Sequence, residues 1–341
     1  MNNNKRIQGQ SLRKRKGHCG KGSRTARADH GSVGLKIRIG AGMYGLTRLI
    51  LASTAFVEIS EQEYVRFKSA KKVLNNIVAI EEKYDTAIEN YRELEEELAN
   101  VTFDYMLYER EPNFIFTTGN TINRRIVNVL TSFRLYNDHT EHHFSSLFGK
   151  ASSQFQVLED IKSKQYDSFI EYRVMEALRN YVQHRGYPLI GYSVGSKWIG
   201  SDADKRSEHR VVLTLDTDEL RQDGVFKRKV LDEIMAVGED PDLKLCIRKY
   251  VECLSDIHGV VRSLTTAETA IADQAMIDAL STYENAAGED PDNAIYAIAK
   301  DETGRIVEKI SLHLQQTDYR KLYEFKNKAL VNLAKRVVTS K

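Results

Sequence analysis

Proline is scarce in this sequence of 341 residues, which contains four prolines, about 1.2% where ~5% is usual. Because helical periodicity also runs through most of the chain, collagen-like, proline-rich and strand-dominated classes are disfavoured. Cysteine is nearly as scarce, and an odd set of three (Cys19, Cys246, Cys253) does not make a disulfide framework. No apolar stretch approaches the length of a membrane span. We therefore expect a cytoplasmic protein in a reducing compartment, with no membrane contact.

Acidic residues are almost absent from the first 42 positions. Residues 1–42 contain eleven Lys or Arg and one acid, a net charge of +10, so the other 299 residues carry −8 to give the overall +2. A basic arm rich in Gly, Ser and Asn, without aromatic residues, is expected to be disordered. Its run Arg13, Lys14, Arg15 and Lys16 is a candidate nucleic-acid contact with salt-sensitive binding. A solvated tail, a targeting peptide or a start at Met43 are the alternatives.

A strand-like run at residues 49–59 leads to Ser60 and Glu63, whose spacing predicts a capping box and a helix start. Apolar residues then recur at steps of four and three over four heptads, which predicts one long helix with a single apolar seam. That seam packs either against its own bundle or against a second protomer. Its members are Val73, Ile77, Ile80, Tyr84, Ala87, Tyr91, Leu94, Leu98 and Val101.

The rest of the chain reads as further helices with two short β elements. Helices are expected over about 120–148, 153–185, from 225 to a break at 238–241, 243–264, from a second capping box at Thr265 and Glu268 to about 288, and 318–338. Strands are expected at 189–199 and 210–216, and a hairpin at 294–299 and 305–313.

This pattern predicts a mainly α fold, a helical bundle with two small β-hairpin elements. We divide the chain into the arm (1–42), a short strand with the long helix (43–112), a helical bundle (113–290) with an inserted β segment (189–216), and a hairpin with a C-terminal helix (291–341).

Two common site patterns fail in context. The glycine-rich run at 40–45 matches the glycine pattern of a dinucleotide-binding motif, but no parallel βαβ pattern follows it. His139, His142 and His143 share one helix, but no cysteine or carboxylate at a recognised spacing completes a metal set. We expect no metal and no cofactor, and we rank metal-dependent hydrolysis through these histidines last.

A polar constellation ends the helix predicted over 153–185. Arg179 is followed directly by Asn180, then by His184, and Gly186 closes the helix. An Arg-Asn pair with a histidine four to six residues after the Arg is expected about 0.1 times by chance in this composition. Arg134 and His139 on the preceding helix are further candidates for the same cleft. The spacing predicts a site rather than a random match.

In these residues the sequence resembles the HEPN superfamily of helical-bundle proteins, whose members carry such an Arg-Asn-x3-His motif. The resemblance implies a metal-independent endoribonuclease that acts as a homodimer, in a bacterial toxin or antiphage defence system with an antitoxin or defence partner protein. It implies catalytic roles for Arg179, Asn180 and His184. Arg185 and Tyr187 are expected to contact RNA. In one branch of the family a tyrosine lies two residues after the histidine, whereas Gly186 is found here and Tyr187 follows it.

The residue chemistry agrees with this implication. An imidazole serves as base or acid near neutral pH, and a guanidinium matches phosphate oxygens. Arg179 lies about 140° around the helix from His184, so a second copy across a twofold axis is needed to bring both to one phosphodiester. The alternative is a non-catalytic helical protein that binds a partner or nucleic acid, in which Arg179 and His184 decorate a helix end.

Overall fold

The computed structural model describes residues 43–48, 55–108, 113–187, 190–238, 241–288, 290–291 and 295–338. The basic arm, including Arg13–Lys16, lies outside them. Eight α-helices occur in the described part: α1 (Glu61–Leu107), α2 (Phe114–Phe148), α3 (Ser153–Ser168), α4 (Ile170–Arg185), α5 (Thr217–Asp223), α6 (Arg228–Met235), α7 (Leu243–Ala287) and α8 (Gln315–Lys326). The mainly α prediction is confirmed.

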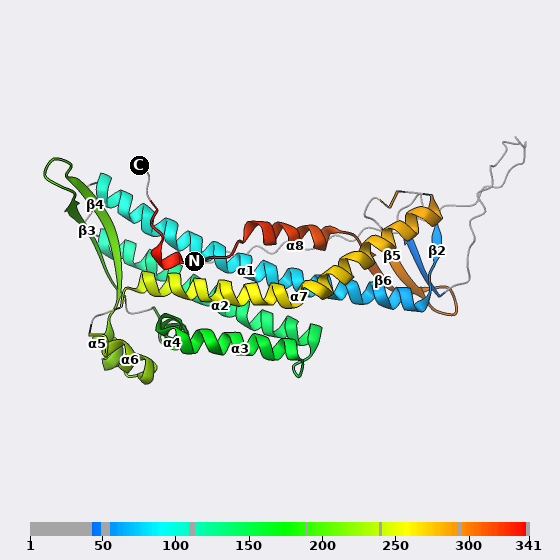
Figure 1. The fold of residues 1–341 in the computed structure, drawn as a ribbon, viewed down its shortest axis with the longest axis horizontal. Coiled ribbons are helices and arrows are strands. Elements are labelled where there is room, and N and C mark those ends of the chain that lie inside the picture. The colour runs from blue at the N-terminus through cyan, green and yellow to red at the C-terminus, as the bar shows by residue number, and fades with distance from the viewer. Residues whose placement is uncertain are drawn as a thin grey trace, which may run out of the picture. The chain divides into compact units, whose positions relative to one another are not determined.

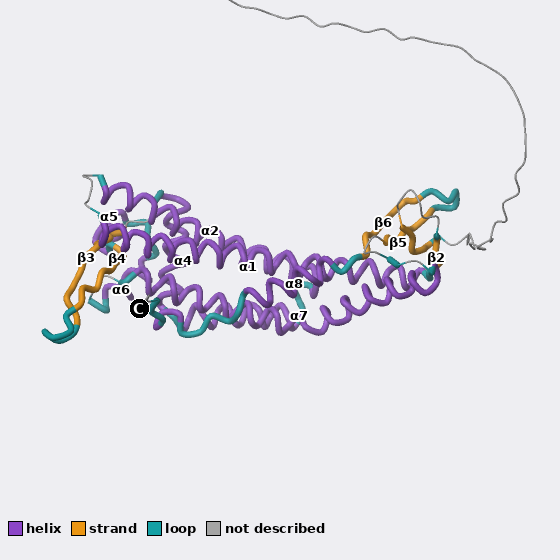
Figure 2. The backbone as a smooth tube through the Cα atoms, turned by 90° about the horizontal axis from the view of Figure 1, so that it is seen from above, coloured by secondary structure: helices purple, strands orange, loops and turns teal. Residues whose placement is uncertain are grey.

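The long helices α1, α2 and α7 pack side by side, as both views show (Figures 1 and 2). The capping box that opens α1 is confirmed, because Ser60 Oγ accepts from the Glu63 amide and the Glu63 carboxylate accepts from the Ser60 amide. The heptad seam is buried within this chain's own bundle, where Tyr84, Ala87 and Leu94 are at most 1% exposed. Apart from the partly buried Val73, the seam therefore packs inside this chain's own bundle.

A four-stranded antiparallel sheet in the order β2-β1-β5-β6 covers the start of α1 and the end of α7 (Figure 1). Its strands are β1 (Tyr44–Arg48), β2 (Phe56–Glu58), β5 (Ile295–Lys300) and β6 (Ile306–Leu312). The expected hairpin at the end of the chain is present, and β1 and β2 extend it. A Cβ atom at Gly45 would collide with the Phe56 ring, so a larger residue at this position requires that ring to move.

The inserted β segment is a two-stranded hairpin, β3 (Ile190–Ile199) and β4 (Arg206–Leu215). Alternate residues of β4 face the helices, and Val211, Leu213 and Leu215 are buried. The second strand begins at Arg206, four residues earlier than predicted.

The helix predicted over 153–185 is wrong as a single element, because the chain is extended at Phe169 between α3 and α4. Arg173 stabilises this break by donating to the carbonyl oxygens of Tyr166 (2.8 Å) and Asp167 (3.0 Å) at the end of α3. The Lys249 ammonium lies 3.9 Å from the centre of the Phe169 ring. The Arg173 side chain thus replaces helical hydrogen bonds that the break removes.

The predicted helix start at Thr265 is also wrong, because α7 runs unbroken through it. The Thr265 hydroxyl is buried and donates to the carbonyl of Val261 one turn earlier, which satisfies it inside a continuous helix. The last helix, predicted to reach residue 338, ends at Lys326. The chain beyond it continues to the short 3₁₀ helix η1 (Leu333–Lys335).

Side chains of α7 hold this C-terminal segment. Ser255 Oγ accepts from the Leu330 amide at 2.9 Å, and the Glu252 carboxylate accepts from the Leu333 amide at 2.8 Å. These bonds compete with helical hydrogen bonds, so the segment follows the bundle surface instead of forming further helical turns.

A buried carboxylate joins the three long helices. Glu81 of α1 is 2% exposed and receives two bonds from the Arg262 guanidinium of α7, at 2.8 and 2.7 Å. His258 Nε2 lies 3.2 Å from Glu81, and Tyr136 of α2 lies 3.1 Å from His258 Nδ1. Because a carboxylate only accepts, Nε2 carries the proton and Nδ1 accepts from the Tyr136 hydroxyl.

The charges in this network are well defined. Burial alone raises the pKa of Glu81, but the hydrogen bonds from Arg262 and His258 and the positive charge of Arg262 lower it overall to about 2. Burial lowers the pKa of His258, so its ring is neutral at neutral pH.

Among the described residues, no helix combines the length and the apolar character needed to cross a membrane.

We predict that Glu81→Gln lowers the free energy of unfolding by about 3–5 kcal/mol at pH 7, because it leaves the Arg262 guanidinium without its charged partner. Glu82→Gln, one residue away and exposed, should change it by less than about 0.5 kcal/mol. Urea unfolding of both variants and the wild type measures this.

The same pair predicts a pH dependence. A depressed carboxylate pKa stabilises the fold fully above its ordinary value of 4.5, and this stabilisation is lost as pH falls towards about 2. The stability difference between wild type and Glu81→Gln should therefore shrink steadily across that range in urea titrations. A difference that stays constant from pH 6 to pH 3 would contradict the assignment.

Candidate functional site

The predicted motif lies on the second half of α4. The Arg179 side chain is 17% exposed and forms an ion pair with Glu176 at 3.2 Å. It also donates to the Gln183 side-chain oxygen at 3.4 Å, and its Nε atom is buried without a partner. The guanidinium is therefore held against its own helix by a carboxylate one turn away.

Asn180 and His184 are both exposed and lie four residues apart, on one stripe of α4. In the described structure neither side chain is engaged by a hydrogen bond or an ion pair. The helix ends directly after them, because Gly186 has a φ of 130°, a conformation that favours glycine. The His184 imidazole and the Asn180 amide are thus exposed to solvent, whereas the Arg179 guanidinium is mostly buried.

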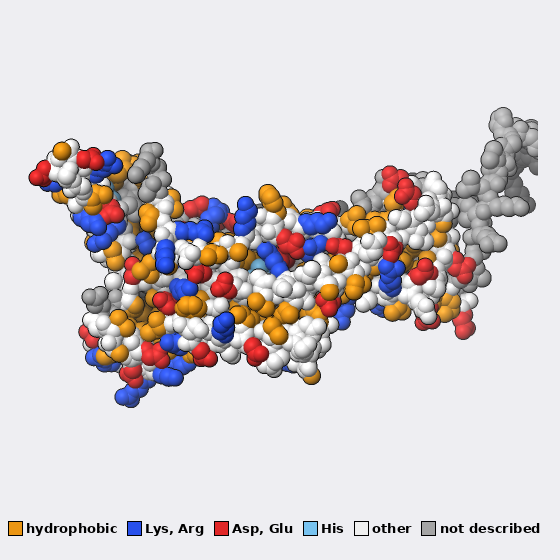
Figure 3. All heavy atoms as spheres, viewed as in Figure 1, with side chains coloured by type: hydrophobic (Ala, Val, Ile, Leu, Met, Phe, Trp, Pro, Cys, Tyr) orange, Lys and Arg blue, Asp and Glu red, His pale blue; other side chains and the backbone are white. Residues whose placement is uncertain are grey.

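The other residues predicted to contact RNA have mixed surroundings. The Arg185 guanidinium lies 3.9 Å from the Asp223 carboxylate, and Tyr187 is 58% exposed just beyond the helix. Figure 3 shows acidic and basic side chains interspersed over the visible face of the bundle. The described part of the chain therefore offers the end of α4 as a small polar surface rather than a broad basic one.

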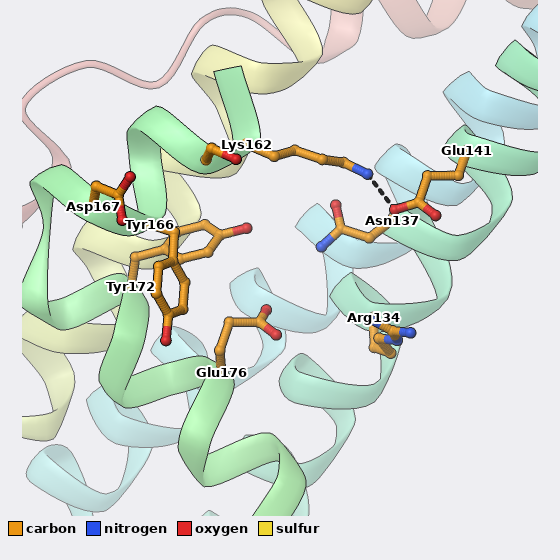
Figure 4. A pocket seen from close by; sticks show the side chains of 9 residues that line it. Arg134, Asn137, Glu141, Lys162, Tyr166, Asp167, Tyr172 and Glu176 are labelled. Carbon is orange, nitrogen blue, oxygen red and sulfur yellow. Dashed lines mark hydrogen bonds and ion pairs between the residues drawn. The ribbon is translucent and has the colours of Figure 1, made fainter. Parts of the chain in front are cut away.

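A pocket of about 290 Å³ lies between α2, α3 and α4, next to the motif (Figure 4). Nine residues line it: Arg134, Asn137, Glu141, Lys162, Ser163, Tyr166, Asp167, Tyr172 and Glu176. Glu176 connects the two features, because it faces the pocket and also binds Arg179 and the Tyr250 hydroxyl (2.7 Å). Arg134 lines this pocket, and His139 does not.

Sequence reasoning missed the remaining pocket residues for a physical reason. Tyr172 lies on the apolar stripe of its helix, and polar residues such as Asn137 and Lys162 are common on helices. No spacing within the sequence relates these three, because they come from three helices. Only the packing of α2 against α3 and α4 brings them together.

His143 of the histidine cluster is hydrogen-bonded within the fold, and Cys246 and Cys253 are part of the core. His143 Nδ1 lies 2.7 Å from the Asn76 side-chain oxygen, and burial together with His142 and His139 lowers its pKa. No group of three or more metal-ligating side chains occurs among the described residues. Cys246 and Cys253 are buried and unpaired, and burial raises the pKa of each to about 12, so both remain thiols.

Comparisons of the chain with models of protein families, with curated proteins and with solved structures return no match. The class of protein is therefore defined by the structure itself: a mainly α helical bundle with two small antiparallel sheets.

We predict that Arg179→Ala lowers the free energy of unfolding by about 1.5–3 kcal/mol, because it leaves the Glu176 carboxylate without its charged donor. Arg185→Ala is the matched control: its ion pair is longer and half-exposed, so the loss should stay below about 1 kcal/mol. Urea unfolding at pH 7 measures both. Equal stability of Arg179→Ala and wild type would show that the ion pair does not stabilise the fold.

Proposed function

We propose that this protein is a metal-independent endoribonuclease of HEPN type, which cuts RNA by attack of a 2′-hydroxyl and acts as a homodimer. The observation that carries the proposal is the exposed stripe of Asn180 and His184 at the end of α4, with Arg179 alongside. A role in a bacterial toxin or antiphage defence system, with an antitoxin or defence partner, belongs to the same proposal.

The reaction assigns a task to each side chain. The His184 imidazole of one copy removes the proton from the 2′-hydroxyl, whose oxygen then attacks phosphorus. The bond from phosphorus to the 5′-oxygen breaks, and the imidazolium formed in the first step donates its proton to that leaving oxygen. Asn180, one turn before His184, orients the imidazole or binds a phosphate oxygen by its amide.

Arg179 supplies positive charge for the phosphate. Its bond to Gln183 is long, at 3.4 Å, so a phosphate oxygen replaces Gln183 with a shorter, charge-assisted bond. The ion pair with Glu176 meanwhile holds the guanidinium in position. Since Arg179 and His184 point about 140° apart on one helix, the arginine of one copy serves the histidine of the other.

We predict that His184→Ala lowers RNA cleavage in EDTA by at least about 100-fold, because it removes the proton-transfer group. His142→Ala, which removes another exposed histidine, should cleave like wild type. A gel assay on a single-stranded RNA measures the rates. If His184→Ala cuts as fast as wild type, or if wild type does not cut, the proposal fails.

A mixing experiment tests the shared site. Arg179→Ala and His184→Ala are each expected to be inactive, but a heterodimer of the two contains one site with both side chains intact. Activity should therefore return when the variants are mixed. If each copy holds a complete site, mixing restores nothing.

A second candidate function, a non-catalytic interaction protein, has an observation of its own. Large apolar side chains, each 48–73% exposed, cluster at the end of α1 and the start of α2, which favours a protein contact. They are Phe103, Met106, Leu107, Tyr108, Ile115 and Phe116. For this function, wild type should not cleave RNA, and Phe103→Ser with Phe116→Ser should abolish self-association in sedimentation equilibrium while His184→Ala retains it.

A further inference from the structure

The pocket between α2, α3 and α4 has a buried hydrogen-bond acceptor without a partner. Asn137 is 7% exposed, and its side-chain oxygen is buried with no partner. Figure 4 shows its amide directed into the pocket, between Lys162 and Glu176. An orphaned buried acceptor is costly to a fold, and a ligand that donates a hydrogen bond removes this cost.

The charges of the lining select the kind of ligand. Three carboxylates (Glu141, Asp167, Glu176) and two cations (Arg134, Lys162) line the pocket, a formal charge of −1. Both cations are already in ion pairs: Arg134 with Asp138 at 2.8 Å, and Lys162 with Glu141 and Glu159. No unpaired cation is therefore present among the lining side chains, all of which the structure describes, to receive an anion.

The rim and walls favour a cation. Asp167 is exposed at the rim, and its carboxylate makes no bond to another described side chain. Tyr166 and Tyr172 contribute aromatic rings whose centres are 6.3 Å apart. Ring faces attract cations, and the Lys227 ammonium already lies 5.0 Å from the centre of the Tyr166 ring. The Tyr172 hydroxyl points towards Asn137 (Figure 4). An acceptor at the floor, a carboxylate at the rim and aromatic walls match a group with several N–H donors and a positive charge.

We propose that this pocket binds a small organic cation with an ammonium or guanidinium head group. The N–H donors of the head group bind the Asn137 oxygen and the Asp167 carboxylate, while the tyrosine rings cover its apolar part. The pocket volume of about 290 Å³ is at the low end for ligand sites, so the ligand is small. This site is independent of RNA cleavage, and His184→Ala should bind the cation like wild type.

Agmatine, which has a guanidinium at one end and an ammonium at the other, is the probe for isothermal titration calorimetry on the full chain. We expect one saturable site. The matched control ligand, 4-guanidinobutyrate, has a carboxylate in place of the ammonium and should bind at least about tenfold more weakly. Inorganic phosphate should not compete.

Variants test the assignment to named atoms. Asn137→Asp keeps the shape and adds a negative charge, so it should bind agmatine at least about tenfold more tightly. Asp167→Asn, at the exposed rim, should weaken binding, whereas Asp160→Asn, which lies on α3 outside the lining, should leave it unchanged.

Several results would overturn the proposal. Absence of saturable agmatine binding to the wild type shows that the pocket holds water only. Equal binding of the two guanidino compounds, or competition by phosphate, refutes the selection for a cation. An affinity unchanged in both Asn137→Asp and Asp167→Asn places any bound agmatine elsewhere.

Discussion

The Glu81 carboxylate is the contact on which the bundle depends most. It lies inside the fold, where an isolated charge would be prohibitively costly, and Arg262 and His258 of α7 compensate it. Through His258 the network reaches Tyr136 of α2. Arg262 also donates to the Asn327 carbonyl at 2.9 Å, so the same group fixes the point where the chain leaves α8. One buried charge therefore sets the register of three long helices and the C-terminal segment.

The rigid frame has consequences for α4. Its inner face is buried, and Glu176 anchors it to Tyr250 of α7 while also binding Arg179 within α4. On the outer stripe, the side chains of Asn180 and His184 form no hydrogen bond or ion pair with the described part of the chain. A fixed helix with an unengaged imidazole at its end suits chemistry that needs precise positions from two copies. The same fixed helix also forms one wall of the neighbouring pocket, through Tyr172 and Glu176.

Much of the fold could be predicted, because it follows from local signals. The Ser60 capping box and the heptad seam behind it give the start and the buried face of α1, and the hairpin of β5 and β6 follows from its turn residues. The errors share one cause. At Phe169 and after Lys326, side chains from another helix form hydrogen bonds with the backbone. At Thr265, the hydroxyl donates to a carbonyl of its own helix. The residue pattern along the sequence does not indicate any of these bonds.

The sequence by itself determined that this chain is helical, which residues form the seam of α1, and that Arg179, Asn180 and His184 lie together on one helix, since these depend on spacing along the chain. Only the tertiary structure decided that Glu176 forms an ion pair with Arg179 and that the apolar seam of α1 packs within this chain's own bundle. It also decided that Asn137 faces a pocket with tyrosines from two other helices. Such relations join residues that are close in space but unrelated in spacing, so they emerge only when the helices pack.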